Sequence, residues 1–238
     1  MIKGIRKLGS SFADYFIVSH CFACSRAVSN GAVICKDCYK EIEKTKENVC
    51  DKCGMDKKFC VCARMVYHFS GVSAPFKNVG IAQKGLYGIK FNSDKVSVDF
   101  YAQHMVERLK SRNKDLRFDF VTYVPMNFGK LIKRGYNQAK WLATAVAELI
   151  NVQVKDDILY RSIFSRTQHI DSGITERFNN AYKSYHRRKK GKTISGRVLL
   201  IDDIKTTGAS LDACAKELLY AGADEVFCLV ALIGDKNS

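Results

Sequence analysis

The most informative stretch of the sequence places two acids and a hydroxyl-rich turn directly after a short apolar run. The apolar run covers residues 198–201, Asp202 and Asp203 follow it, and the turn 206–210 carries three hydroxyl side chains around Gly208. Carboxylates accept hydrogen bonds from sugar hydroxyls. A glycine-containing turn that opens a helix directs successive backbone N–H groups toward an anion. These residue types in this order predict a binding site for a sugar phosphate.

The element that must position this turn is a central strand of a parallel sheet. Four consecutive apolar residues that end abruptly in charge are typical of a strand covered on both faces. Such sheets bind ligands outside the carboxyl ends of their strands, and the sequence predicts that this strand ends at Asp202. A helix from residue 210 to about Ala221 should follow. A simpler alternative is a capped turn beside two solvated acids, which does not account for the ordered combination.

The same segment resembles the 5-phosphoribosyl-1-diphosphate (PRPP) loop of type I phosphoribosyltransferases. The shared pattern is four hydrophobic residues, Asp-Asp, two residues, Thr-Thr-Gly and Ala-Ser. In that family the two acids contact the ribose hydroxyls, and the following turn holds the 5-phosphate. The resemblance therefore implies a PRPP site, served by Mg²⁺, that comprises Asp202, Asp203, Lys205, Thr206, Thr207, Gly208, Ala209 and Ser210.

A second segment narrows the resemblance. The predicted strand 121–125 is followed by a loop, and residues 134–138 (Arg-Gly-Tyr-Asn-Gln) then open a predicted helix. Together with residues 166–168 and 176–180, and more weakly 88–91, this order is similar to ComF-type proteins, PRPP-domain proteins associated with bacterial DNA uptake.

That resemblance implies further roles within the predicted sugar-phosphate site. The loop 126–134 would be the pyrophosphate loop, with Lys130 and Arg134 placed to attract the diphosphate, and the polar segment 155–175 would be a lid that excludes water. Two functions follow. The first is a PRPP-binding protein that handles single-stranded DNA in natural transformation, with DNA-uptake or recombination proteins as partners. The alternative is an active phosphoribosyltransferase with an unidentified acceptor.

Cysteine spacing predicts an N-terminal metal-binding module. Eight of the ten cysteines precede Ala63 and form spaced pairs: Cys21, Cys24, Cys35, Cys38, Cys50, Cys53, Cys60 and Cys62. A Cys-x-x-Cys pair places two thiolates on one ion, so two pairs complete a closed tetrahedral zinc site. We expect two structural Zn²⁺ ribbons in series, although a cross-braced arrangement of the same residues is also open. The remaining Cys214 and Cys228 are expected to be buried apolar residues.

Positive charge concentrates outside this module. The first 62 residues carry +4 of the formal net charge of +15, and eight thiolates with two Zn²⁺ ions bring them near zero. A basic stretch with Tyr182, Tyr185 and His186 interleaved offers cations for phosphates and rings for unstacked bases. Its candidate nucleic-acid contacts are Lys183, Arg187, Arg188, Lys189, Lys190 and Lys192. The alternative is an ordinary solvated charge run.

Composition and element order give the overall organisation. We expect an α/β fold like that of type I phosphoribosyltransferases, a parallel sheet flanked by helices in residues 63–238, after a zinc-ribbon module in residues 1–62. Predicted strands cover residues 65–69, 118–125, 152–154, 196–201 and 225–232, and predicted helices cover 95–110, 135–150, a stretch near Glu176, and 210–221. No apolar run reaches the ~20 residues of a membrane span. These features favour a cytoplasmic protein that is not an integral membrane protein.

Overall fold

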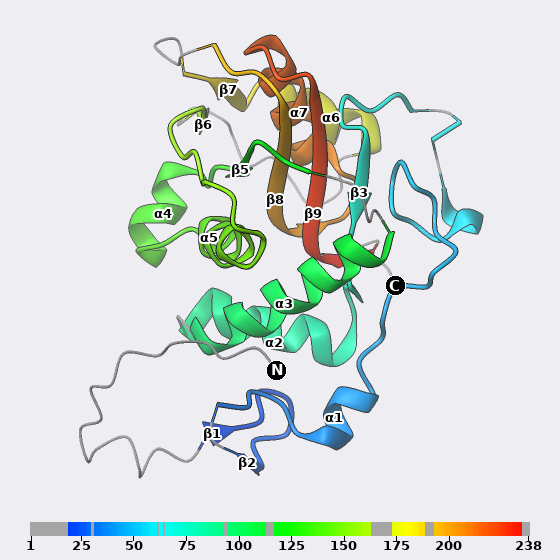
Figure 1. Cartoon of the computed structure of the whole chain (residues 1–238), viewed down its shortest axis with the longest axis vertical. Helices are drawn as coiled ribbons and strands as arrows, with labels where there is room; N and C mark the ends of the chain where they lie inside the picture. The colour runs from blue at the N-terminus through cyan, green and yellow to red at the C-terminus, as the bar shows by residue number, and fades with distance from the viewer. Residues whose placement is uncertain are drawn as a thin grey trace.

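The computed structural model describes residues 19–29, 31–60, 62–63, 65–92, 95–112, 117–162, 173–188 and 193–234. At its centre lies a five-stranded sheet with the order β3-β9-β8-β5, in which β4 also pairs with β9 and every pairing is parallel (Figure 1). The strands are β3 (Gly71–Ser73), β4 (Phe76–Lys77), β5 (Phe120–Tyr123), β8 (Arg197–Lys205) and β9 (Glu225–Ile233). The predicted parallel α/β architecture is confirmed.

Side chains of the central strands alternate between two cores. On β8, Val198 and Leu200 join one core, whereas Leu199 and Ile201 join the other. The first core is covered by α6 (Ile174–Tyr182) and α7 (Ala209–Tyr220). The second core is covered by α2 (Gly80–Asn92), α3 (Lys95–Arg112) and α5 (Gln138–Ile150). Burial on both faces explains the continuous apolar runs of β8 and β9.

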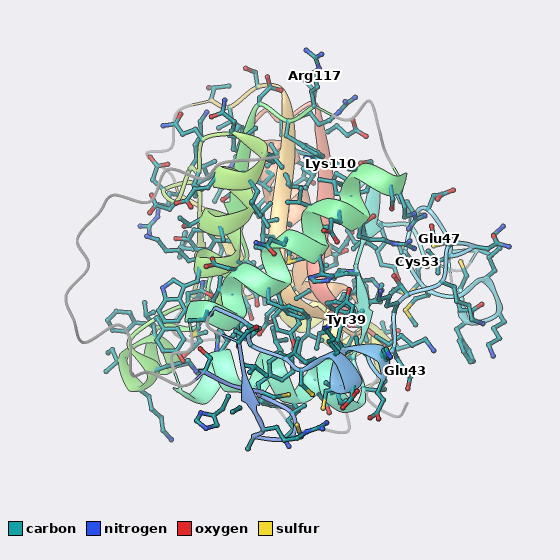
Figure 2. The ribbon with its side chains drawn as sticks, turned by 60° about the horizontal axis from the view of Figure 1, so that its bottom comes forward. Tyr39, Glu43, Glu47, Cys53, Lys110 and Arg117 are labelled. Atoms are coloured by element: carbon teal, nitrogen blue, oxygen red, sulfur yellow. The ribbon has the colours of Figure 1, made fainter. Side chains whose placement is uncertain are left out.

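The cysteine-rich segment packs against this domain at two places. The first ribbon (residues 19–40) contains β1 (Ser19–His20), β2 (Ala27–Val28) and α1 (Lys36–Lys40), and its Tyr39 hydroxyl lies 2.9 Å from Nε2 of His104 on α3. The second ribbon (residues 49–62) contains a 3-10 helix, Lys57–Phe59, and its Cys53 is buried in the core beneath α7. Tyr39 and Cys53 lie on the same side of the molecule, with Glu43 and Glu47 between them along the chain (Figure 2).

The strand that carries the acid pair is longer than predicted. We expected it to end at Asp202, but β8 runs to Lys205, and Asp202 and Lys205 pair with Val230 and Ile233 of β9. The nine-residue apolar strand β9 supplies backbone partners along this whole length, and ladder hydrogen bonds are formed irrespective of side-chain polarity. Both acids therefore project from a strand rather than from a loop.

The predicted pyrophosphate loop 126–134 also differs, because most of it is the short helix α4 (Phe128–Arg134). The Asn127 side chain accepts a hydrogen bond from the Gly129 N–H at 3.0 Å and caps the start, and Gly135 ends the helix with φ 80°. The following helix α5 consequently begins at Gln138, not at 135, with Asn137 as its own cap.

Three other predicted elements are changed. Residues 65–69 are not a strand, because pairing with β9 begins only at Gly71; Tyr67 and Phe69 instead anchor this segment by burying their rings in the core. The predicted strand 152–154 is reduced to one parallel bridge between Val121 and Val154. The segment 155–162 of the predicted lid contains β6 (Leu159–Arg161), which pairs antiparallel with β7 (Tyr185–Arg187).

Candidate functional site

The acid pair lies toward the carboxyl edge of the sheet, just beyond the end of β5, whose last residue Tyr123 pairs with Ile201, and two residues before the end of β8. Asp202 and Asp203 are half-buried. The Asp203 backbone N–H donates to Oδ1 of Asp202 at 2.9 Å, and the Ile204 N–H donates to Oδ1 of Asp203 at 2.8 Å. These bonds fix each carboxylate beside its own strand backbone, and carboxylate oxygens can accept hydrogen bonds from ligand hydroxyls or ligate a divalent cation.

The turn after β8 is held by its own backbone and side chains. Gly208 adopts φ 86°, in the left-handed region that favours glycine, and a Cβ there would lie 3.2 Å from Cε of Lys205. The Thr207 hydroxyl lies 3.4 Å from the Ala209 N–H that opens α7. The buried Lys205 places Nζ 3.4 Å from the Thr206 carbonyl. The turn therefore presents the start of a twelve-residue helix toward the carboxyl edge of the sheet.

Two tyrosines that sequence analysis did not assign to this turn support it. The Tyr67 hydroxyl donates to the Thr207 carbonyl at 3.5 Å, and its ring stacks on Phe69 with centroids 4.7 Å apart. The Tyr185 hydroxyl donates to Oγ of Ser210 at 3.3 Å. Burial raises the pKa of both phenols, so each stays protonated and can donate. Neither tyrosine lies near the turn in sequence, and no local pattern marks these contacts.

A buried carboxylate on α7 is a further polar centre that sequence reasoning missed. The Asp212 side chain is fully buried and accepts from the His68 backbone N–H at 2.5 Å and from the Tyr182 hydroxyl at 2.5 Å. Its Oδ2 also lies 3.0 Å from Nδ1 of His68. Burial, followed by the bond to Asp212, raises the pKa of Tyr182 and keeps the phenol a donor. These contacts fix the segment before β3 against α6 and α7.

The eight N-terminal cysteines form two separate tetrads, and the ligand atoms in each lie within 4.8 Å of one another. The first tetrad contains Cys21, Cys24, Cys35 and Cys38, and the second contains Cys50, Cys53, Cys60 and Cys62. The pairing is therefore sequential, and the cross-braced alternative is wrong.

The spacing within the tetrads tests whether zinc fits. Sγ atoms lie 3.8 Å apart in Cys24–Cys35 and in Cys50–Cys62, and 3.7 Å apart in Cys53–Cys60. A tetrahedral ion with Zn–S bonds of about 2.3 Å requires ligand separations of about 3.8 Å. The Arg26 side chain donates to Sγ of Cys24 at 3.3 Å and lowers the pKa of that thiol to about 6, which favours the thiolate. Both tetrads fit closed structural Zn²⁺ sites.

Comparisons with known proteins agree with this arrangement. A family profile described as "Double zinc ribbon domain" matches residues 12–66. The competence protein ComFC of Streptococcus pneumoniae (strain ATCC BAA-255 / R6) is 26% identical over 204 residues, covering 83% of this chain and 86% of that protein. Together these matches show a similarity to ComF-type proteins. They also support Zn²⁺ as the ion of the two tetrads.

A solved phosphoribosyltransferase structure is also among the proteins that this chain resembles. The adenine phosphoribosyltransferase from Thermoanaerobacter pseudethanolicus is 13% identical, and the alignment covers 59% of this chain and 83% of that chain with a TM-score of 0.36. This likeness is too low to carry an argument about the site. The assignment of the parallel sheet and its flanking helices rests on the strand pairings themselves.

The predicted diphosphate contacts and the predicted nucleic-acid contacts lie on different elements of the domain. Lys130 and Arg134 lie on α4, which follows β5, the neighbour of β8, so they share the carboxyl edge of the sheet with the acid pair. Three of the predicted nucleic-acid contacts are exposed: Lys183 directly after α6, Arg187 on β7, and Arg188 directly after β7. Lys189, Lys190 and Lys192 lie outside the described residues, as does the family signature at residues 166–168.

The structure adds aromatic and basic neighbours to the described part of the basic stretch. The Arg188 guanidinium lies 5.9 Å from the Tyr160 ring centroid, and that ring lies 5.5 Å from His186. On α7, Nζ of Lys216 lies 5.7 Å from the ring of Tyr220, which is 62% exposed. We call this set the basic-aromatic surface: Tyr160, Lys183, His186, Arg187, Arg188, Lys216 and Tyr220.

Within the ranges that the structure describes, no helix has both the length and the apolar character that crossing a bilayer requires.

Proposed function

We propose that this chain binds PRPP, or a closely related sugar phosphate, at the β8–α7 turn and acts in a ComF-type role in natural competence. The observation that carries the proposal is the placement of two fixed carboxylates and a glycine-opened helix start at the carboxyl edge of one parallel sheet. Ligands of such sheets bind at this edge. The competence role is suggested by the similarity to the pneumococcal competence protein ComFC.

Each part of the ligand has a proposed partner. Asp202 and Asp203 would take the ribose hydroxyls and a Mg²⁺ ion, because carboxylate oxygens suit that hard cation. The backbone N–H groups and hydroxyls of residues 206–210 would take the 5-phosphate. Lys130 and Arg134, on the element after the neighbouring strand β5, would attract the diphosphate.

Ligand-induced thermal stabilisation tests this site. At a PRPP concentration one hundred times Kd, binding stabilises the folded state by about 2.7 kcal/mol, which corresponds to a Tm rise of roughly 5–10 °C for a chain of this size. The double variant Asp202→Ala, Asp203→Ala should lose the rise, and Thr207→Ala should reduce it.

The matched control removes two adjacent acids at the opposite, amino edge of the sheet. Like the Asp202/Asp203 variant, Asp224→Ala with Glu225→Ala removes two negative charges. Both residues stand where β9 begins. It should lower Tm slightly, since both side chains make structural contacts, but retain the PRPP-induced rise. A rise that survives in the Asp202/Asp203 variant would place the ligand elsewhere.

We propose that single-stranded DNA lies on the basic-aromatic surface. Its exposed cations attract phosphates, and Tyr160 and Tyr220 offer ring faces on which bases of any sequence can stack. The surface is formed by β6, β7 and α7, so the helix that starts at the proposed sugar-phosphate turn ends beside it.

The salt dependence of binding tests this surface. Lys183→Gln with Arg188→Gln should weaken binding of a mixed-sequence single strand and lower the log–log salt slope by about 1.4 in magnitude, at about 0.7 per phosphate contact. The matched control is Lys36→Gln with Lys40→Gln, two exposed lysines on α1 of the first ribbon. Loss of binding only in the control would move the DNA site to the ribbons.

A second candidate function is phosphoribosyl transfer. It is favoured by the same intact acid pair and turn, since a transferase uses these groups to hold PRPP while diphosphate departs. Release of diphosphate from PRPP on addition of single-stranded DNA or small nucleophiles would support phosphoribosyl transfer. If PRPP binds but no diphosphate is released, only the binding function remains.

The remaining parts of the proposal concern organisation and context. We propose residues 1–62 as the zinc-ribbon module and residues 63–238 as the sugar-phosphate domain. The protein's partners would be DNA-uptake or recombination proteins, and the protein would act in the cytoplasm.

A further inference from the structure

A concave site separate from the β8–α7 turn lies at the carboxyl edge of the sheet, on the side of β9 and β4. It is a cavity of about 420 Å³, within the ~300–1,000 Å³ typical of small-molecule sites. Its walls come from three stretches far apart in sequence: the link between the ribbons, the second ribbon, and the ends of β4 and β9. None of the residues assigned above to the sugar phosphate lines it.

The walls are fixed to the sheet by backbone contacts. In the link between the ribbons, Lys44 forms an antiparallel bridge with Phe76 of β4, and the Lys77 N–H donates to the Glu43 carbonyl at 2.8 Å. In the second ribbon, Gly54 packs so closely on the sheet that a Cβ there would lie 2.8 Å from Cδ1 of Ile233. The cavity is therefore a built part of the domain.

The lining combines an apolar floor with a cationic rim. Val49, Met55 and Ile233 provide apolar surface, and Phe59 stands at the cavity with 57% of its area exposed. Nζ of Lys58 lies 4.7 Å from the Phe59 ring centroid.

Two further lysines of the rim are paired with acids that also line the cavity. Lys46 pairs with Asp56 at 2.9 Å, and Lys77 pairs with Glu43 at 3.0 Å. Three lysines against two acids leave the rim with a net positive charge. An exposed aromatic face beside cations suits a ligand that has a planar ring and a negative group.

The cavity adjoins the proposed sugar-phosphate turn. Gly234 lines the cavity, and its N–H donates to the carbonyl of Lys205, the residue that precedes the turn, at 3.1 Å. A ligand in the cavity would therefore lie one strand away from the acid pair on β8.

We propose that this cavity binds one nucleotide, with its base against Phe59 and the apolar floor and its phosphate at the lysine rim. The nucleotide is either a free mononucleotide or the 5′-phosphorylated end of a single strand, since both present the same base and phosphate. The inference stands independently of PRPP binding at the β8–α7 turn.

Calorimetric titration of the full-length, zinc-loaded protein tests the proposal with two nucleotide probes and one control strand. The probes are adenosine 5′-monophosphate and a short 5′-phosphorylated oligothymidine, and circular single-stranded DNA, which has no ends, is the control strand. The test variant is Lys58→Ala with Phe59→Ala, two exposed residues whose truncation leaves the core intact. The control is Lys57→Ala, an exposed lysine of the same short helix that does not line the cavity.

For whichever probe binds the wild-type protein, the test variant should raise Kd by about tenfold or more. Loss of base stacking on an aromatic ring and loss of the adjacent lysine together weaken binding by about that factor. The control should stay within about twofold of the wild-type protein. Binding of the mononucleotide identifies a free-nucleotide site, and binding of the linear but not the circular strand identifies a strand-end site. Binding of neither probe, or equal binding by wild type and test variant, overturns the proposal. Retention of the PRPP-induced rise in Tm by the test variant separates this result from the function of the turn.

Discussion

Replacement of the buried Asp212 by alanine should destabilise the α/β domain far more than any exposed acid would. The substitution removes the acceptor of the His68 backbone N–H and of the Tyr182 hydroxyl, together with the contact to the His68 ring. Hydrogen bonds to a charged group each contribute about 1.5–3 kcal/mol, and removal of one partner of a buried charged network costs roughly 3–5 kcal/mol in total. At about 2–4 °C per kcal/mol, Tm should fall by roughly 10 °C.

The isosteric Asp212→Asn variant should lose about half as much stability, because one carbonyl oxygen still accepts while the amide nitrogen does not. The assay is thermal and urea unfolding of zinc-loaded protein, followed by circular dichroism. Asp224→Ala is the control, because that exposed side chain accepts one bond, from the Gly196 N–H at 2.9 Å. An Asp212→Ala protein within about 1 kcal/mol of the wild type would refute the reasoning, since three contacts to a fully buried carboxylate would then contribute almost nothing.

Three further outcomes are expected. Gly208→Ala should cost about 1–2 kcal/mol of stability in urea titrations and weaken the PRPP-induced rise in Tm, because alanine is strained at φ 86°; an unchanged rise would contradict the role of the turn. Cys53→Ser should lose zinc and unfold the core at a lower temperature than Cys24→Ser does, because Cys53 is buried against the core whereas Cys24 is exposed; equal Tm values for the two zinc-depleted variants would argue against this difference. The 2.7 Å bond from Lys140 lowers the pKa of Asp156, so their pair should contribute up to about 1 kcal/mol above the unfolded pKa of the acid and lose it as pH falls through the folded value; Asp156→Asn should abolish that part of the pH dependence of unfolding.

The sequence by itself determined the chemistry that depends on short spacing. Pairs of cysteines two residues apart can share an ion whatever the rest of the fold does, so the zinc chemistry was readable from the chain. The order of apolar run, acids, glycine turn and helix likewise predicted the start of β8, the turn, and α7 to within one residue at each end, because each depends on local backbone preferences and burial.

Two local predictions were wrong: the end of β8 and the loop after β5. The Asp202–Asp203 pair looked like a strand end, yet the backbone partners supplied by β9 carry the strand three residues further. The segment after β5, predicted as a loop, carries both a capping asparagine, Asn127, and a terminating glycine, Gly135. These two local signals are sufficient to predict α4.

Only the tertiary structure decided which distant groups meet. Sequential pairing of the cysteine tetrads depends on how each ribbon turns, which ligand spacing leaves open. Asp212 lies 144 residues from His68 and 30 from Tyr182, and Tyr67 lies 140 residues from Thr207. The cavity joins walls from both ends of the chain. Such contacts arise from the packing of whole elements against both faces and one edge of the sheet, and short-range sequence patterns carry no record of that packing.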